Sequence, residues 1–405
     1  MDAIAKLSLI AGAMQFEPDG DLKPLPSTSE IVPSCGLPLP VCDPTSNEAA
    51  ALSRKGDALP IVNAVMPGGR RIALLKTLQT SACERDCYYC CFRAGRDSWR
   101  TTLSPDEMAQ VFIKLNQARA VDGLFLSSGI AGGGVRTQDR IIATAEILRF
   151  KFGFKGYLHL KIMPGAEFAQ VERTMQLANR VSVNLEAPNT GRLVKLAPHK
   201  VFIEELLRPL KWIDAIRSSQ PASQAWNGRW PSTTTQFVVG AAGESDLELM
   251  TTTAALNRQV HLARAYFSGF NPIKGTPLEN MPPNNPWREH RLYQASFLLR
   301  DYGFDLEELP FAGDGNLPLG TDPKLAWARV NLSEAPIEIN RAERHELLRI
   351  PGVGPKTAQA ILAARRLNKI RGLNDLRSLG IPVEKAAPFL LLDGHRTPVQ
   401  LPLFL

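Results

Sequence analysis

Cysteine placement constrains this chain more than any other feature. Four of the six cysteines fall within nine residues, at Cys83, Cys87, Cys90 and Cys91, and the first three have the spacing C-x3-C-x2-C. This is too tight for a disulfide framework and is typical of metal ligation by reduced thiols. Three thiolates on one loop can hold three irons of a [4Fe–4S] cluster and leave the fourth iron open to a small molecule. A zinc site or a purely structural cluster stays an alternative, although structural zinc sites usually have four ligands in two paired knuckles.

Short β-rich runs alternate with helical stretches around this loop. We expect six strands, over residues 72–78, 123–127, 157–162, 181–186, 235–240 and 262–268. Helical periodicity fills the gaps, starting at a capping box between Ser104 and Glu107 with Pro105 at the first helical position. The alternation predicts a parallel sheet with right-handed crossovers. Six βα units predict an α/β fold, a partial (βα)6 barrel of the TIM type over residues 61–305, with its chemistry at the carboxyl ends of the strands.

The remaining segments are expected to be simpler. Residues 1–60 predict an irregular, Pro-rich N-terminal extension, and the apolar stretch at 7–14 is not expected to be a signal peptide because it lacks a cleavage site. Residues 306–335 predict a linker, 336–395 a small all-α module (the C-terminal module), and 396–405 a tail. With 44% hydrophobic and 21% charged residues the chain can bury a sizeable core, and without an 18-residue apolar run no membrane-spanning helix is expected.

The C-terminal module contains the run Ile350-Pro351-Gly352-Val353-Gly354-Pro355-Lys356-Thr357. Asn340 is expected to cap the helix before this run, with Glu343 reaching back, and Pro355 is expected to begin the helix after it. The two glycines permit a tight turn whose backbone N–H groups can approach a phosphate at the start of the second helix. Such contacts position a nucleic acid without reading its bases.

This run resembles the helix-hairpin-helix motif, which grips DNA through its hairpin. The resemblance implies that the DNA-binding residues are Gly352, Val353, Gly354, Lys356 and Thr357. Between Pro336 and Arg396 there are eleven Lys and Arg against six Asp and Glu, so most of the chain's net charge of +7 lies here. A weaker second copy over residues 373–391 is expected to be a structural partner. A helical hairpin used for protein contacts stays an alternative.

The cysteine spacing, the aromatic Tyr89 before the third cysteine and the position after the first strand resemble the radical SAM superfamily. The resemblance implies that Cys83, Cys87 and Cys90 hold a [4Fe–4S] cluster. It also implies that S-adenosylmethionine binds the open iron through its amino and carboxylate groups, and that one electron then yields a 5′-deoxyadenosyl radical. The implied cofactor-binding residues are Tyr89, Ser127, Ser128, Gly129, Ser182, Asn184, Glu186, Gly240 and Gly243. An ordinary structural role stays open for each of these nine residues.

A radical SAM barrel followed by a helix-hairpin-helix resembles a group of radical SAM proteins for DNA modification or repair that are linked to a uracil-DNA-glycosylase-like partner. The resemblance covers roughly residues 60–395 and implies an enzyme that modifies or repairs a nucleotide in DNA. It also implies a flavodoxin or ferredoxin as reductant and a cytoplasmic, nucleoid-associated location without a membrane. Two alternatives are an enzyme that modifies structured RNA such as tRNA, and a non-catalytic iron–sulfur sensor that binds DNA.

Three cysteines and the tail remain. Cys35, Cys42 and Cys91 are expected to be ordinary thiols, although Cys35 is a weak catalytic candidate, because a thiol can donate a hydrogen atom to a substrate radical. The tail residues Gln400, Leu401, Leu403 and Phe404 resemble the short motif by which bacterial repair proteins bind the DNA sliding clamp. Packing of this apolar tail against its own protein stays an alternative.

Overall fold

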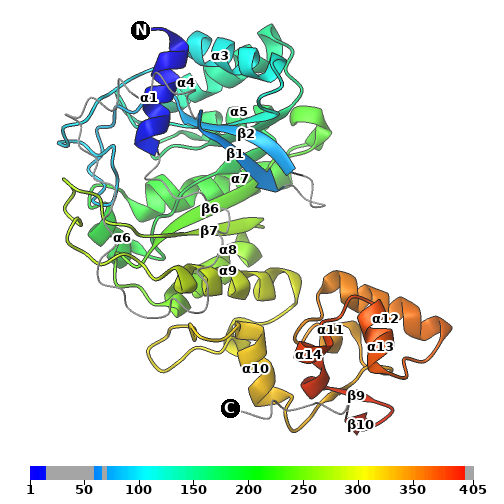
Figure 1. Cartoon of the computed structure of the whole chain (residues 1–405). Coiled ribbons are helices and arrows are strands. Elements are labelled where there is room, and N and C mark those ends of the chain that lie inside the picture. The colour runs from blue at the N-terminus through cyan, green and yellow to red at the C-terminus, as the bar shows by residue number, and fades with distance from the viewer. Residues whose placement is uncertain (15–58, 66–70, 397–405) are drawn as a thin grey trace. The chain divides into compact units, whose positions relative to one another are not determined.

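The computed structural model describes residues 1–14, 59–65 and 71–396 of the 405-residue chain. The chain forms two compact units (Figure 1). The first comprises Met1–Glu244 and Leu256–Pro286, and the second comprises Ser245–Ala255 and Trp287–Leu405. No helix in the described ranges is long and apolar enough to cross a membrane.

A seven-stranded sheet with its strands in chain order forms the centre of the first unit. Its members are β1 (Ile61–Val65), β2 (Arg71–Leu78), β3 (Gly123–Ser127), β4 (Tyr157–Lys161), β5 (Arg180–Ser182), β6 (Ser232–Val239) and β7 (Arg264–Gly269). Strands β2 to β7 are parallel, and β1 is antiparallel to β2. The order confirms the predicted partial barrel of six parallel strands and adds one strand, β1, that was not predicted.

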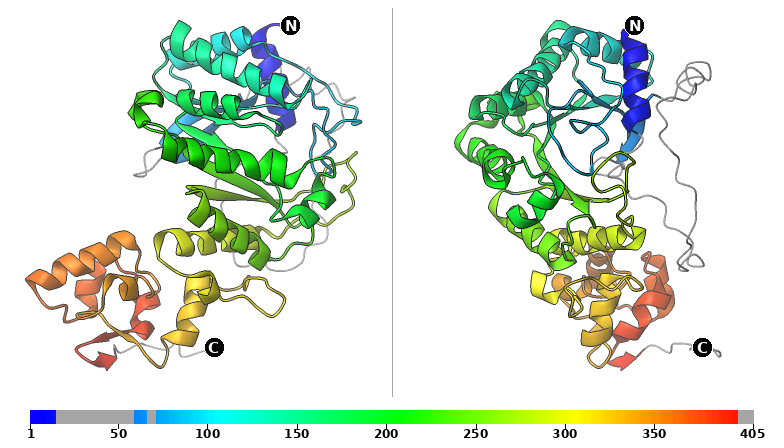
Figure 2. Two further views of the ribbon diagram at one scale, coloured as in Figure 1. Left: turned by 180° about the vertical axis from the view of Figure 1, so that it is seen from behind. Right: turned by 90° about the vertical axis from the view of Figure 1, so that its left-hand side faces the viewer.

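Helices on the outer face of this sheet connect the parallel strands (Figure 2). They are α3 (Pro105–Gln117), α4 (Gly134–Glu146), α5 (Phe168–Leu177), α6 (Thr190–Leu196), α7 (Arg208–Ser219) and α8 (Asp246–Gln259). The expected capping box is present at the start of α3, where Glu107 N–H donates to Ser104 Oγ and Ser104 N–H donates to the Glu107 carboxylate.

The side chains of the strands divide sharply between the two faces of the sheet. Leu124 and Leu126 on β3 are completely buried on the helix-covered face, as are Leu158 and Leu160 on β4. Alternate residues point the opposite way, into the barrel, and many of these are polar. Every second position is therefore available to line an interior site.

One helix corrects the expectation of an irregular N-terminus. Helix α1 spans Ala3–Met14, begins where Ala5 N–H donates to the Asp2 carboxylate, and buries Leu7 and Ile10. Lys6 also forms an ion pair with Glu107 on α3, at 2.6 Å. Residues three positions apart lie on one face of a helix, so Leu7 and Ile10 pack from the same side of α1.

The second unit consists mainly of helices. They are α9 (Pro286–Asp301), α10 (Pro323–Asn331), α11 (Arg344–Leu347), α12 (Pro355–Leu367), α13 (Leu373–Ser378) and α14 (Val383–Ala386). A small sheet in the order β10 (His395–Arg396), β9 (Leu390–Leu392), β8 (Ile337–Glu338) closes it. The segment expected to be a linker contains α10, because the Asp322 side chain caps this helix and Pro323 occupies a first-turn position.

The predicted cap at Asn340 is wrong. Helix α11 is capped by Glu343 in a capping box with Glu346, and Asn340 lies outside the helix. The side-chain amide of Asn340 forms two hydrogen bonds with the backbone of Ile370. Its oxygen accepts from the Ile370 N–H at 3.0 Å, and its nitrogen donates to the Ile370 carbonyl at 2.9 Å. Asn340 therefore holds together the two ends of the first helical hairpin.

Helix α8 contributes to both compact units. Its buried N-terminal residue Asp246 forms an ion pair with Arg288 at 2.7 Å and accepts from Leu317 N–H at 2.9 Å. The remainder of the helix, from Leu256 on, belongs to the first unit. The boundary between the units therefore differs from the expected one at residue 305, because the start of α8 and most of α9 belong to the second unit.

Candidate functional site

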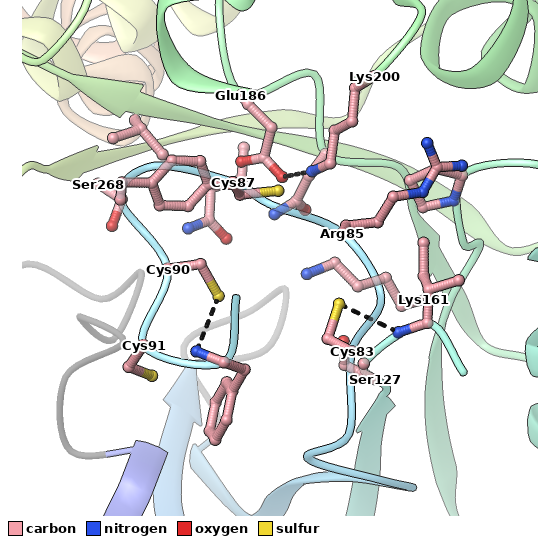
Figure 3. Close-up of a pocket in the computed structure, with 18 of the residues that line it drawn as sticks. Cys83, Arg85, Cys87, Cys90, Cys91, Ser127, Lys161, Glu186, Lys200 and Ser268 are labelled. Carbon is pink, nitrogen blue, oxygen red and sulfur yellow. Dashed lines mark hydrogen bonds and ion pairs between the residues drawn. The ribbon is translucent and has the colours of Figure 1, made fainter. Parts of the chain in front are cut away.

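The cysteine loop follows β2 at the carboxyl end of the parallel strands. Backbone hydrogen bonds hold it in place from outside, since Glu84 N–H donates to the Ile130 carbonyl and Tyr88 N–H donates to the Leu196 carbonyl, both at 2.7 Å. Cys83, Cys87 and Cys90 line one pocket and lie on three sides of it (Figure 3). We call this the cysteine pocket.

Two of the three thiols already accept backbone hydrogen bonds. Cys83 Sγ accepts from Ile130 N–H and Cys90 Sγ from Phe92 N–H, each at 3.4 Å. Burial raises the pKa of Cys87 to about 11, although the nearby Lys200 ammonium opposes this shift. A bound metal would favour the thiolate, because a coordinating thiol loses its proton.

The donor set suits a polynuclear cluster. Within the described ranges, no three His, Cys, Asp or Glu residues lie close enough together to hold a single metal ion. In a [4Fe–4S] cluster each cysteine binds a different iron, so the thiols lie farther apart than around a single metal ion. Three thiols spread around one pocket fit that requirement.

A buried ion pair closes one side of the cysteine pocket. Lys200 Nζ lies 3.0 Å from Glu186 Oε1, and both side chains are less than 10% exposed. Burial alone would raise the pKa of Glu186, but Lys200, Lys161 and a hydrogen bond from Tyr89 outweigh it and keep the pKa below its ordinary value. Glu186 also adopts a φ of +64°, a conformation uncommon for a side chain of this kind. Strained residues cluster at functional sites, so this carboxylate is a strong candidate contact for a ligand.

Six of the nine predicted cofactor contacts line the cysteine pocket. They are Tyr89, Ser127, Ser128, Gly129, Asn184 and Glu186. The other three are not among its lining residues. Ser182 Oγ instead lies 3.0 Å from His159 Nε2, and Gly240 and Gly243 occupy positive-φ positions after β6. Cys91 lines the pocket as well, whereas Cys35 and Cys42 lie outside the described residues.

The sequence reading missed several polar residues of the cysteine pocket. These are Arg85, Lys161, Lys200, Gln236 and Ser268. A signal for two of them was present, because Lys161 and Ser268 alternate with apolar neighbours on their strands. Gln236 follows three threonines, so no alternation of apolar and polar residues marks it. Arg85 and Lys200 lie on loops, where no periodicity marks an inward-facing side chain.

A second candidate surface lies on the C-terminal module, where α11 and α12 meet. The turn between them contains Gly352 at a φ of +82°, and α12 begins at Pro355 as predicted. The backbone N–H groups of Gly354, Lys356 and Thr357 have no hydrogen-bond partner in the described part of the chain. Lys356 is exposed beside them. Free N–H groups at a helix N-terminus next to a cation form an anion-binding surface.

A buried lysine fixes the turn from behind. Lys324 on α10 donates to the Val353 carbonyl at 2.5 Å and lies over the ring of Tyr302. The C=O and N–H groups of a planar trans peptide point in opposite directions. Lys324 therefore turns the N–H of Gly354 away from itself and toward the open side of the turn.

The two helical hairpins of the C-terminal module abut at this turn. A Cβ atom at Gly352 would lie 2.6 Å from Pro382, in the turn between α13 and α14. Residues 333–390 match the family model described as the helix-hairpin-helix motif. The motif is present in this chain. The second hairpin supports the turn of the first, as expected for a structural partner.

Comparisons with whole proteins show only distant similarity. No curated protein matches the sequence. Among solved structures, the chain is similar to methylornithine synthase (PylB), at 15% identity and a TM-score of 0.42, over 56% of this chain and 61% of that one. It is also similar to a radical SAM methyltransferase from Sphaerobacter thermophilus, at 15% identity and a TM-score of 0.40, over 62% and 79% of the two chains.

A third similar structure is the FeFe-hydrogenase maturase HydG from Carboxydothermus hydrogenoformans, at 14% identity and a TM-score of 0.40, over 56% of this chain and 51% of that one. The chain thus spans less than two thirds of the synthase and of this maturase. The fold therefore rests on the strand order, and the candidate site rests on the residues of the cysteine pocket.

Proposed function

We propose that this protein is a radical SAM enzyme that acts on a nucleotide in nucleic acid, with DNA as the first candidate substrate. The observation that carries the proposal is a combination within one chain. A three-cysteine loop lies at the carboxyl end of an open parallel barrel, and a helix-hairpin-helix with free backbone N–H groups follows it. The first feature suits radical chemistry and the second suits a phosphate backbone.

Several residues of the cysteine pocket have a role in this proposal. Cys83, Cys87 and Cys90 would hold a [4Fe–4S] cluster, and Ser127, Ser128, Gly129, Asn184 and Glu186 would contact S-adenosylmethionine. When bound, these two groups supply a 5′-deoxyadenosyl radical that abstracts hydrogen from the substrate. Lys200 keeps the Glu186 carboxylate ionised and fixed in direction, so that it can accept hydrogen bonds from a ligand.

The radical activity has a direct test. Full-length protein with a reconstituted cluster, a strong reductant and S-adenosylmethionine is expected to release 5′-deoxyadenosine, measured by chromatography. Cys87→Ala is expected to abolish the product, whereas Cys91→Ala is expected to retain it. A wild-type protein that binds the cluster yet never cleaves S-adenosylmethionine would support the alternative of a non-catalytic sensor.

The DNA substrate rests on the helix-hairpin-helix. A target nucleotide must leave its stack to reach a pocket of this kind, as it does in other enzymes that act on bases. Structured RNA is the second candidate, because a grip on the backbone does not depend on base sequence. Competition between duplex DNA and tRNA for binding to the protein distinguishes these two candidate substrates. A clear preference for tRNA would identify structured RNA, and not DNA, as the substrate. Mass spectrometry of nucleosides, with and without turnover, would then identify the product.

Three partners complete the proposal. A flavodoxin or ferredoxin would supply the electron, and a uracil-DNA-glycosylase-like protein would act in the same process. The tail residues Gln400, Leu401, Leu403 and Phe404 lie outside the described residues, and we propose that they bind the DNA sliding clamp. Clamp binding by the intact protein, with about micromolar affinity, should be lost on truncation after Val399. Equal binding by both forms, or by neither, would contradict this.

A further inference from the structure

The wall of the cysteine pocket formed by β6 and β7 carries two polar side chains that are separate from the proposed cofactor contacts. Gln236 on β6 and Ser268 on β7 both line the pocket. The register pairs Val238 with Ser268, and Gln236 lies two positions before Val238, so both polar side chains point to the same, inward face of the sheet. The proposed cofactor contacts come instead from the cysteine loop and from the ends of β3 and β5.

Both side chains leave hydrogen-bonding groups unused. In the part of the chain that the structure describes, neither the amide of Gln236 nor the hydroxyl of Ser268 forms a hydrogen bond. The ammonium group of Lys161 on β4 forms none there either, and Lys161 lies across the pocket from Ser268 (Figure 3). Ser268 is only 5% exposed. A buried polar group without a partner costs free energy, and a ligand that bonds it recovers this cost.

Hydrogen-bond donors outnumber acceptors among these unused groups. An ammonium group can only donate, whereas a side-chain amide and a hydroxyl can each donate and accept. Glu186 is the only carboxylate among the described residues that line the pocket, and it is paired with Lys200 at 3.0 Å. A ligand that matches Lys161, Gln236 and Ser268 therefore presents more carbonyl oxygens than N–H groups.

Apolar and aromatic side chains complete this part of the cysteine pocket. Phe92, Met163, Val238 and Phe270 line it, and all four are buried. A few convergent polar groups on an apolar lining are typical of pockets that orient a small ligand. Enzymes that take a base out of its stack read the hydrogen-bonding edge of the base and pack its faces against apolar or aromatic side chains. The residues of this wall supply both kinds of contact.

We propose that Gln236, Ser268 and Lys161 form a subsite for the base of the substrate nucleotide, and that this base is a pyrimidine with two carbonyls, the pattern that thymine and uracil share. This inference rests on the proposed function and deepens it by naming the base. The Gln236 amide can accept from the ring N–H and donate to the carbonyl beside it. Lys161 and Ser268 can donate to the remaining carbonyl lone pairs. Cytosine has an amino group in place of one carbonyl, so a donor of the protein would face a donor of the base.

Calorimetric titration of the full-length, cluster-containing protein tests this without reductant, with S-adenosylhomocysteine added to fill the proposed cofactor site. Thymidine and 2′-deoxyuridine are expected to bind at least about tenfold more tightly than 2′-deoxycytidine, and the tighter of the two identifies the base. Gln236→Glu replaces the amide donor by an acceptor, so it should weaken thymidine about tenfold and remove the preference over 2′-deoxycytidine. Ser268→Ala removes one donor and should weaken thymidine about fivefold. Gln259→Glu makes the same exchange as Gln236→Glu at an exposed position on α8 and should have no effect. Circular dichroism verifies that each variant is folded.

The outcomes separate this inference from the proposed function. Equal affinity for thymidine and 2′-deoxycytidine, or equal effects of Gln236→Glu and Gln259→Glu, would overturn the base subsite even if 5′-deoxyadenosine forms normally. The subsite would also be overturned if Gln236→Glu weakened S-adenosylhomocysteine as much as thymidine, because Gln236 would then be a cofactor contact. Thymidine-selective binding by a protein that never forms 5′-deoxyadenosine would uphold the base subsite and contradict the radical enzyme.

Discussion

Lys324 is a single residue on which the geometry of the nucleic-acid-binding turn depends. Burial lowers its pKa from 10.5 to about 7, with Asp322 opposing the shift and Arg349 adding to it. Between pH 7 and 10.5 the unfolded chain therefore holds a proton that the folded chain lacks. Stability increases with pH wherever the unfolded state binds more protons.

We accordingly expect the free energy of unfolding of the wild type, relative to Lys324→Met, to rise between pH 7 and pH 9.5. The rise should reach at most about 3 kcal/mol, since one pKa unit corresponds to about 1.4 kcal/mol. Urea unfolding of both proteins at the two pH values measures it. A difference that stays flat would mean that Lys324 remains charged when folded.

The buried Glu186–Lys200 pair depends on both of its charges. Lys200→Met leaves a carboxylate buried without its cation and should lower the free energy of unfolding by about 3–5 kcal/mol. The double variant Glu186→Gln with Lys200→Met should recover part of this loss, because it removes both charges together. Chemical denaturation of the three variants and the wild type provides the comparison. A double variant no more stable than Lys200→Met would contradict this explanation.

The two hairpin turns of the C-terminal module differ in one measurable way. Gly352 and Gly380 both have positive φ, at +82° and +78°, but only Gly352 lies against another turn. Gly380→Ala should cost about 1–2 kcal/mol for its backbone conformation alone. Gly352→Ala should cost roughly 2–4 kcal/mol, because its Cβ must also displace Pro382. Equal losses in thermal unfolding would show that the hairpins do not press on each other.

The elements also show which parts of the fold the sequence could predict. The six parallel strands and the capping box of α3 were predictable, because alternation and capping are local signals. Helix α1 and the role of Asn340 were not, since both depend on distant residues such as Glu107 and Ile370. Strand β5 was predicted to continue to Glu186, yet it ends at Ser182, before the left-handed conformation of Glu186 turns the chain.

The candidate site likewise has residues that the sequence could predict and residues that only the fold brings together. The cysteine spacing was enough to identify the thiols of the pocket, since a loop of nine residues cannot place them far apart. Lys200 joins the pocket from a loop more than a hundred residues away, and only the folded chain places it beside Glu186.

We expect one substitution to weaken nucleic-acid binding without changing the radical chemistry. Lys356→Glu should weaken duplex DNA binding about tenfold for all sequences alike and reduce the slope of log affinity against log salt by about one. Release of 5′-deoxyadenosine without DNA should not change, because Lys356 lies outside the unit that contains the cysteine pocket. Arg366→Glu makes the same charge change on the same helix, ten residues away, and should weaken binding less. Equal effects of the two variants would point to general charge rather than to the turn.

The course of α8 also limits how this architecture can be inherited. Asp246 is held by Arg288 and Leu317, so the start of α8 belongs to the second unit, although in the sequence it lies between the sixth and seventh strands of the sheet. A single recombination point after the barrel would therefore leave that piece behind, with its buried aspartate stripped of both partners. Exchange of the C-terminal unit between genes would require two breakpoints, or a donor whose own eighth helix already carries the matching acid.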